Sequence, residues 1–402
     1  MTVGAAQVLY RSPDLLVRHV PAADPSRHAA TFDCYHDERT LDRPGFGEDY
    51  FARHGIAATH LLSRDNDWFQ HPELPKALAA MRAAASGAGS VLAYGSSMGA
   101  YAAVRFADAV GATAVLALSP QYSIDPAKAP FERRWGQDRR RLRFLPALDG
   151  PIRCRVRPVV AYDPSGLDRH HADLIARDMP VQRLRLPYAG HPVGGCLQEA
   201  GLLHSLVMDT LDGTLDAAAV ERAARAARRT LASYHGNLAA CQPAVRPNLA
   251  IALALRAVAL DPGRPESHLA LALRLSAAGR HAEALAAHGR VAELERHPGY
   301  LMDFCIALRK AGDSAGALAL AHEIQAAWPH HAGIYNTIAE LLRARRDLPG
   351  ALHHAEQALA LDPASAHYQR TAAVLRAKLH PLAPHLAARA LLLRARKALR
   401  RQ

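Results

Sequence analysis

The chain has 402 residues, of which 50% are hydrophobic, and it carries a formal net charge of +12. This length accommodates two domains that each bury a hydrophobic core. Because the basic residues are dispersed and lack the interleaved aromatic residues of a nucleic-acid binder, we expect no nucleic-acid partner. The sequence contains no apolar run of about 18 residues and does not begin with a basic region followed by an apolar stretch. We therefore expect neither an integral membrane segment nor a secretory leader.

The five cysteines are scattered through the sequence and include no C-x-x-C pair. An odd number of isolated thiols is typical of a reduced protein, so we expect a cytoplasmic location. Paired histidines begin at positions 170, 330 and 353, but none has a third ligand at metal-site spacing. The sequence therefore predicts no metal site and no cofactor.

The first half of the sequence alternates short apolar runs with amphipathic segments. The runs predict strands at residues 29–34, 56–62, 91–94, 113–118, 159–162 and 181–186. Helical spacing follows at residues 74–84, 99–107, 168–177 and 195–211. This alternation predicts an α/β domain over residues 1–214, with a mostly parallel sheet covered on both faces. Ligands of such a sheet bind at the carboxyl ends of its strands.

The most informative motif is Gly95-Ser96-Ser97-Met98-Gly99, which lies between the strand at 91–94 and the following helix. A G-x-S-x-G motif between a strand and a helix is typical of a nucleophile elbow. The sharp turn exposes the central serine, and small residues on either side let the strand and helix approach closely. We therefore expect Ser97 to be a nucleophile, with the Met98 amide placed to bind an oxyanion.

An acid and a histidine follow the serine in the order that a triad requires. Asp163 and Asp168 come after the strand at 159–162, and His191 comes after the strand at 181–186. His191 is expected to take the serine proton, and an aspartate to orient the imidazole. Asp163 begins a D-P-S-G turn, where a local structural role is common. Asp168 is the preferred acid, although an aspartate at this point can also be a helix N-cap.

Residues 28 to about 212 resemble an α/β-hydrolase domain on the elbow motif and on the order of serine, aspartate and histidine. The resemblance implies a Ser-His-Asp acyl-transfer site. It also implies a second oxyanion donor from the loop after the strand at 29–34, near Tyr35 or His36. The sequence departs from many lipases in having no HGGG-type loop there.

Two further loops follow strands of the predicted sheet and should face the same edge as Ser97. They contain Asn66, Trp68 and Tyr122, which are expected to line a substrate pocket. For Trp68 and Tyr122 the alternative is aromatic packing beneath long loops.

Residues 131–143 form a strongly basic segment that includes Trp135. In hydrolases this interval commonly carries a lid, and a basic lid would suit an anionic substrate. The alternative is an arginine-rich helix face exposed to solvent.

The second half, residues 215–402, shows only helical spacing and contains internal repeats. Aligned segments begin at positions 279, 312 and 346, so they lie 33 and 34 residues apart. The stretch 248–366 resembles tetratricopeptide repeats, which have this period and a small residue where two helices cross. The repeats are predicted at 266–298, 299–332 and 333–366, with a capping helix at 382–400.

A stack of such helix pairs has a concave face that usually binds a protein or peptide. The candidates for residues on that face are His268, Arg274, Tyr300, Asp303, Tyr335 and Asn336.

The sequence as a whole predicts a serine esterase, thioesterase or acyltransferase that forms an acyl-enzyme on a small-molecule or carrier-bound acyl substrate. The joining of these two modules suggests surface-glycan or envelope metabolism, by analogy alone. The alternative is a non-catalytic adaptor, in which the repeats bind partners and the hydrolase scaffold is degenerate.

Overall fold

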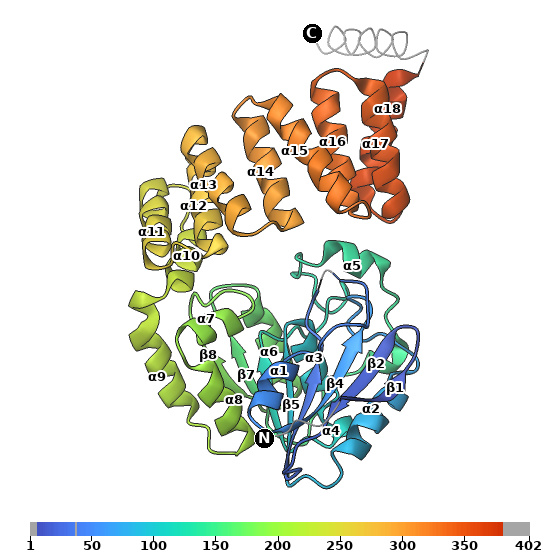
Figure 1. Cartoon of the computed structure of the whole chain (residues 1–402), viewed down its shortest axis with the longest axis vertical. Coiled ribbons are helices and arrows are strands. Elements are labelled where there is room, and N and C mark those ends of the chain that lie inside the picture. The colour runs from blue at the N-terminus through green and yellow to red at the C-terminus, as the bar shows by residue number, and fades with distance from the viewer. Residues whose placement is uncertain (1–5, 37, 381–402) are drawn as a thin grey trace, which may run out of the picture. The chain divides into compact units, whose positions relative to one another are not determined.

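The computed structural model describes residues 6–36 and 38–380. The chain divides into two compact units, Met1–Asp261 and Pro262–Gln402. The first unit contains the sheet and extends beyond position 214, because the helices over residues 217–260 belong to it. The expected capping helix at 382–400 lies outside the described residues. Figure 1 shows the sheet in blue to green and the helical repeats in yellow to red.

An eight-stranded sheet forms the centre of the first unit, in the order β1-β2-β4-β3-β5-β6-β7-β8. Strand β2 is antiparallel to both β1 and β4, and all other neighbours are parallel. The six predicted strands correspond to β3–β8. The bounds are β1 (Gln7–Arg11), β2 (Leu15–Val20), β3 (Arg27–Phe32), β4 (Ala57–Ser63), β5 (Ser90–Ser96), β6 (Ala114–Leu118), β7 (Val159–Tyr162) and β8 (Gln182–Arg185).

Helices cover both faces of this sheet. One face packs against α2, α3, α4 and α6, and the other against α1, α7, α8 and α9. Strand β5 shows why both faces need cover, since Val91 and Ala93 point into one hydrophobic core and Leu92 and Tyr94 into the other. The helices are α1 (Glu48–Arg53), α2 (Leu74–Ala84), α3 (Met98–Arg105), α4 (Ala107–Val110), α5 (Gly136–Arg141), α6 (Asp168–Asp178), α7 (Gly194–Glu199), α8 (Leu203–Leu211), α9 (Ala217–Ala227), α10 (Ala232–Ala240) and α11 (Pro247–Leu260).

Two features of this unit differ from the expectation. The β1–β2 hairpin extends the sheet before its first predicted strand. The predicted helix at 195–211 is two helices, α7 and α8, because the chain turns at Gly201, whose φ is 69°. A positive φ is readily adopted only by glycine and ends the first helix there.

The second unit consists of helices that repeat at a fixed spacing. Helices α12, α14, α16 and α18 begin at positions 265, 298, 332 and 366. One hydrophobic cluster joins α14, α15 and α16, and the next joins α16, α17 and α18, so each core is completed by the neighbouring repeat. The bounds are α12 (Pro265–Ala277), α13 (His281–Leu294), α14 (Pro298–Lys310), α15 (Ser314–Ala327), α16 (Ala332–Ala344), α17 (Leu348–Leu361) and α18 (Ala366–Leu379).

Small residues recur at equivalent positions of α13, α15 and α17. Ala284, Ala317 and Ala351 are each at most 1% exposed. Asp313 and Asp347 cap the second helices of two repeats by accepting a hydrogen bond from the backbone three residues later. The repeat region therefore has the architecture that the sequence period predicts.

Within residues 6–36 and 38–380, no helix has both the length and the apolar character needed to cross a bilayer.

Candidate active site

Ser97 occupies a strained turn between β5 and α3. Its φ of 53° and ψ of −115° are unusual for a residue other than glycine. The turn fits because the residues two positions before and after the serine are glycines. A Cβ on Gly95 would lie 2.3 Å from the backbone of Gly99, and a Cβ on Gly99 would lie 2.3 Å from the carbonyl oxygen of Phe32. Both glycines are therefore required by close packing of α3 against the sheet.

The structure brings Ser97, His191 and Asp168 into one line of hydrogen bonds. The distance from Ser97 Oγ to His191 Nε2 is 2.9 Å. On the other side of the ring, His191 Nδ1 lies 3.0 and 2.8 Å from the two carboxylate oxygens of Asp168. A neutral imidazole that donates its Nδ1 proton to Asp168 accepts the serine hydroxyl at Nε2. This is the arrangement in which a histidine can remove the serine proton.

The two aspartates after β7 have different partners. Asp163 binds backbone only, accepting from the amides of Ser165 and Tyr188 at 2.8 and 3.0 Å and from Gly190 at 2.9 Å. It thus fixes the loop that carries the histidine. Asp168 is the first residue of α6 rather than its N-cap, and its carboxylate contacts the imidazole directly.

Asp168 also lies beside a cation from the loop between β6 and β7. The Nη1 atom of Arg134 is 2.8 Å from Asp168 Oδ1, and Asp168 is only 2% exposed. Burial by itself would raise the pKa of this carboxyl, but the hydrogen bond from His191 and the charge of Arg134 outweigh it and hold the pKa below its usual value. Asp168 is therefore a carboxylate at neutral pH.

Arg134 is shared between two buried carboxylates. Its Nη2 atom is 2.6 Å from Glu132 Oε2, and the same oxygen lies 2.9 Å from His171 Nε2. The Nδ1 atom of His171 accepts the amide of Tyr122 at 3.1 Å, so Nε2 carries the proton and His171 is neutral. Burial is the main cause that lowers the pKa of His171. A chain of polar contacts thus joins His171, Glu132 and Arg134 to the acid of the triad.

The basic segment 131–143 combines exposed arginines with two that pair with carboxylates. Arg134 pairs as described, and Arg141 pairs with Asp138 and Asp65 at 3.2 and 3.4 Å. These cations are engaged by carboxylates of the same unit, which leaves them less available to an anionic substrate.

Aromatic rings from three loops pack together, and one of them lies beside the histidine. The ring of Trp135 is 6.0 Å from that of His191, 5.5 Å from that of Trp68 and 4.8 Å from that of Tyr35. We refer to Tyr35, Trp68 and Trp135 as the aromatic wall. It gives the site an apolar side next to the imidazole.

Gln121, which the sequence analysis did not single out, contacts the Ser97 hydroxyl. Its Nε2 atom is 3.0 Å from Ser97 Oγ, and its Oε1 atom accepts from the indole of Trp68 at 3.3 Å. Gln121 is 0% exposed. Trp68 is therefore linked to Ser97 indirectly, by its hydrogen bond to Gln121.

In the loop expected to supply the second oxyanion donor, the His36 amide is engaged by a side chain. The His36 amide donates to Asn66 Oδ1 at 3.0 Å, and Asn66 Nδ2 donates back to the His36 carbonyl at 2.5 Å. The expectation for His36 is thereby corrected, because this amide is already engaged, and Asn66 closes the loop instead of facing a substrate. The Tyr35 hydroxyl donates to Asp138 at 3.4 Å. Met98 is the first residue of α3, where backbone amides have no partner within the helix.

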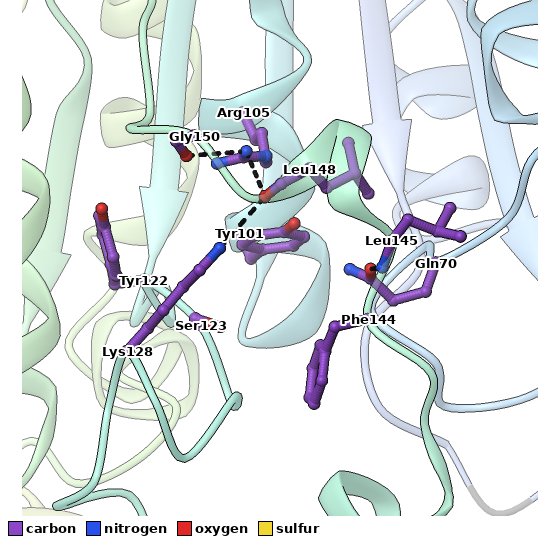
Figure 2. Close-up of a pocket in the computed structure, with 10 residues that line it drawn as sticks. All are labelled: Gln70, Tyr101, Arg105, Tyr122, Ser123, Lys128, Phe144, Leu145, Leu148 and Gly150. Atoms are coloured by element: carbon purple, nitrogen blue, oxygen red, sulfur yellow. Dashed lines mark hydrogen bonds between the residues drawn. The ribbon is translucent and has the colours of Figure 1, made fainter.

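Tyr122 is placed away from the serine. It lines a cavity of about 10 Å³ whose lining includes Tyr101, Arg105 and Lys128 but no residue of the triad (Figure 2). Its hydroxyl donates to Asp178 at 2.7 Å. The cavity has room for about one water molecule, and Figure 2 shows Arg105 and Lys128 both directed at the carbonyl of Leu148. The expectation that Tyr122 faces the substrate is therefore corrected.

Among the described residues, one group has ligand atoms close enough to hold a metal. Single ligand atoms of Asp14, His71 and Glu73 lie within 4.8 Å of one another, and all three residues are partly exposed. His71 Nε2 is already bonded to Asp67 at 2.6 Å. Partly exposed groups of this kind are common without a metal, and we assign none.

No protein-family model and no curated protein sequence matches the chain. Solved structures that match include a tetratricopeptide-repeat protein of Thermus thermophilus, at 20% identity and a TM-score of 0.35, over 45% of this chain and 97% of that one. MamA of Desulfovibrio magneticus RS-1 matches at 18% identity and a TM-score of 0.33, over 41% of this chain and 95% of that one. Such low TM-scores carry no argument, so the repeat architecture rests on the helices described above.

Proposed function

We propose that the first unit is a serine acyl hydrolase or acyltransferase. The observation that carries this proposal is the line of hydrogen bonds from Ser97 Oγ through His191 to Asp168. The strained turn at Ser97 and the chain order serine, aspartate, histidine fit the α/β-hydrolase resemblance. Three side chains from three different strand ends meet here, which a structural role alone does not require.

In the proposed reaction, Ser97 Oγ attacks the carbonyl carbon of an ester or thioester while its proton moves to His191 Nε2. The carbonyl π bond opens to an oxyanion near the Met98 amide. When the carbonyl re-forms, the bond to the leaving group breaks, and His191 gives its proton to that group. Water or an acceptor alcohol then attacks the acyl-enzyme with His191 as base, which releases the acid or new ester and restores Ser97. Asp168 holds the ring and stabilises the imidazolium throughout.

The residues around the site favour a substrate with an apolar group. Trp135 of the aromatic wall lies beside His191, whereas Arg134 and Arg141 of the basic segment are paired with carboxylates. We therefore assign the Tyr35 and Trp135 rings of the wall to an acyl chain or an apolar leaving group, with the buried Trp68 packed against both.

The repeat unit is proposed to bind a protein or peptide. Its helix pairs have the tetratricopeptide spacing, and repeats of this kind present an extended binding surface. This role also defines the second candidate function, an adaptor without catalysis. The observation that favours the adaptor is the low exposure of Ser97, which is 4%.

Labelling of the full chain with a fluorophosphonate separates the two candidates. We expect rapid labelling that maps to Ser97 and is abolished in Ser97→Ala. His191→Gln should slow labelling by about 10³-fold or more, because the base is lost. Absence of labelling in a folded wild-type chain would reject the hydrolase proposal and support the adaptor.

A further inference from the structure

The orientation of the Gln121 side chain is determined by its two neighbours. An indole nitrogen can only donate, so the Gln121 atom that faces Trp68 Nε1 at 3.3 Å must be the oxygen. The opposite atom, which faces Ser97 Oγ at 3.0 Å, is then the amide nitrogen. Trp68 is 1% exposed, so it is itself held by packing. The amide is therefore a donor fixed toward the nucleophile before any substrate arrives.

Ser97 Oγ consequently has a partner on each side. It donates its proton to His191 Nε2 at 2.9 Å and accepts from Gln121 Nε2 at 3.0 Å. A donor to the hydroxyl oxygen stabilises negative charge that develops there when the proton leaves. Because Gln121 is 0% exposed, water does not compete for this contact.

The His36 amide in the loop after β3 is not available as a second donor. That amide is engaged by Asn66 at 3.0 Å. In the tetrahedral intermediate, Ser97 Oγ and the oxyanion are bonded to the same carbon. A donor that reaches one of these oxygens therefore lies close to the other.

We propose that the Gln121 side-chain amide is the second oxyanion donor of this site, acting together with the Met98 backbone amide. This inference rests on the proposed acyl-transfer function. It makes Gln121 a catalytic residue and Trp68 a positioning residue that acts through it. Donors fixed in advance toward developing charge are worth about 10²–10³-fold in rate each.

The test measures the second-order rate constant of fluorophosphonate labelling at Ser97 in the full chain. In this reaction Oγ bonds to phosphorus, fluoride leaves, the proton passes to His191, and the phosphoryl oxygen occupies the oxyanion position. Gln121→Glu keeps the acceptor for Trp68 but replaces the donor with a carboxylate. We expect labelling to slow by about 10²–10³-fold at pH 8. Gln121→Met, which is similar in volume, should slow it by a similar factor.

Two further variants serve as a test of the positioning role and as a matched control. Trp68→Phe keeps the donor but frees its orientation, so we expect a smaller loss, of about threefold to tenfold, in line with a single misaligned hydrogen bond. Gln182→Glu makes the same chemical change at the amino end of β8, and labelling should stay at the wild-type rate. Thermal melting of each variant reports whether it is folded.

The pH profile separates a donor from a structural support. The labelling rate of Gln121→Glu is compared with that of the wild-type chain at each pH, so the titration of His191 affects both rates. The ratio of wild-type to variant rate should shrink as pH falls, because a protonated carboxyl donates a hydrogen bond and a carboxylate does not. A constant ratio, or wild-type rates in both Gln121 variants, would overturn the assignment of Gln121 while the proposed function stands. An unlabelled wild-type chain would overturn both.

Discussion

The two units of this chain place their polar residues in opposite ways. The sheet unit buries charged and polar groups together at the strand ends, and Asp168, Glu132 and His171 are each at most 2% exposed. The repeat unit keeps its ion pairs at the surface, as between Arg280 and Glu283, and buries alanines such as Ala317 where helices cross. Buried polar groups are costly unless they are fully paired. We therefore expect chemistry in the sheet unit, where buried polar groups are concentrated. We expect a scaffold in the repeat unit, where they are fewer.

The largest effect should come from Asp168, the acid of the proposed triad. Asp168→Asn keeps the shape of the side chain but disturbs the histidine tautomer, so we expect fluorophosphonate labelling to slow by about 10³–10⁴-fold. Asp173→Asn makes the same change on the same helix, where Asp173 pairs with Arg183. An equal rate in the two variants would mean that Asp168 does not orient the base.

The same substitution should have different effects on the ion pairs of the two units. Arg134→Met leaves Glu132 and Asp168 buried without their shared cation, and loss of one partner from a buried pair destabilises by about 3–5 kcal/mol. Arg280→Met removes an exposed pair, and we expect no measurable change in the melting temperature. Chemical denaturation of both variants checks the contrast, which fails if the two unfold at the same denaturant concentration.

Acid should destabilise the sheet unit through two buried histidines. Burial, with a smaller contribution from neighbouring histidines, lowers the pKa of His28 to about 4, and burial likewise lowers the pKa of His60 to about 4. The unfolded chain then binds more protons than the folded chain, so stability is complete above the ordinary histidine pKa of 6.5 and is lost as the pH falls toward 4. Each group should contribute a slope of about 1.4 kcal/mol per pH unit in this window.

Unfolding free energies measured between pH 7 and 5 test this slope. His28→Gln retains a group that can hydrogen-bond to Thr59, and the variant should lose less stability on acidification than the wild type. A wild-type stability that is flat across this window would show that neither histidine is held neutral by the fold.

The smallest effect should come from packing in the repeats. Ala317→Leu adds volume at a helix crossing that is 0% exposed, and overpacking of this kind typically costs about 1–3 kcal/mol. Ala319→Leu, on the exposed side of the same helix, should be neutral. Equal unfolding midpoints for the two variants would argue against close contact at Ala317.

The elements that sequence patterns predict well are those that depend on local residues. The strand, elbow and helix around Ser97 follow from a single stretch, and the repeats follow from spacing. The β1–β2 hairpin was not predicted, because its pairing with β4 joins residues distant in the sequence, as between Leu15 and Ser63. The helix break at Gly201 was likewise missed inside an apolar segment.

Prediction of the site from the sequence was limited in the same way, to features that depend on local residues. The order of Ser97, Asp168 and His191 could be read from the chain, but the contacts of Gln121 and Arg134 could not, since they depend on how loops fold over the sheet. One signal was present for Gln121. It is a polar residue shortly after β6, the strand beside the elbow strand, where the sequence analysis chose Tyr122 instead.

The placement of Asp163 has a mechanical consequence. Asp163 holds the backbone amides of Tyr188 and Gly190, and Asp168 holds the imidazole of His191, so the backbone and the ring of one loop are both tied to the segment after β7. The acid and the base therefore lie on segments that are tied together, whereas Ser97 comes from a separate turn and meets them through its 2.9 Å contact with His191.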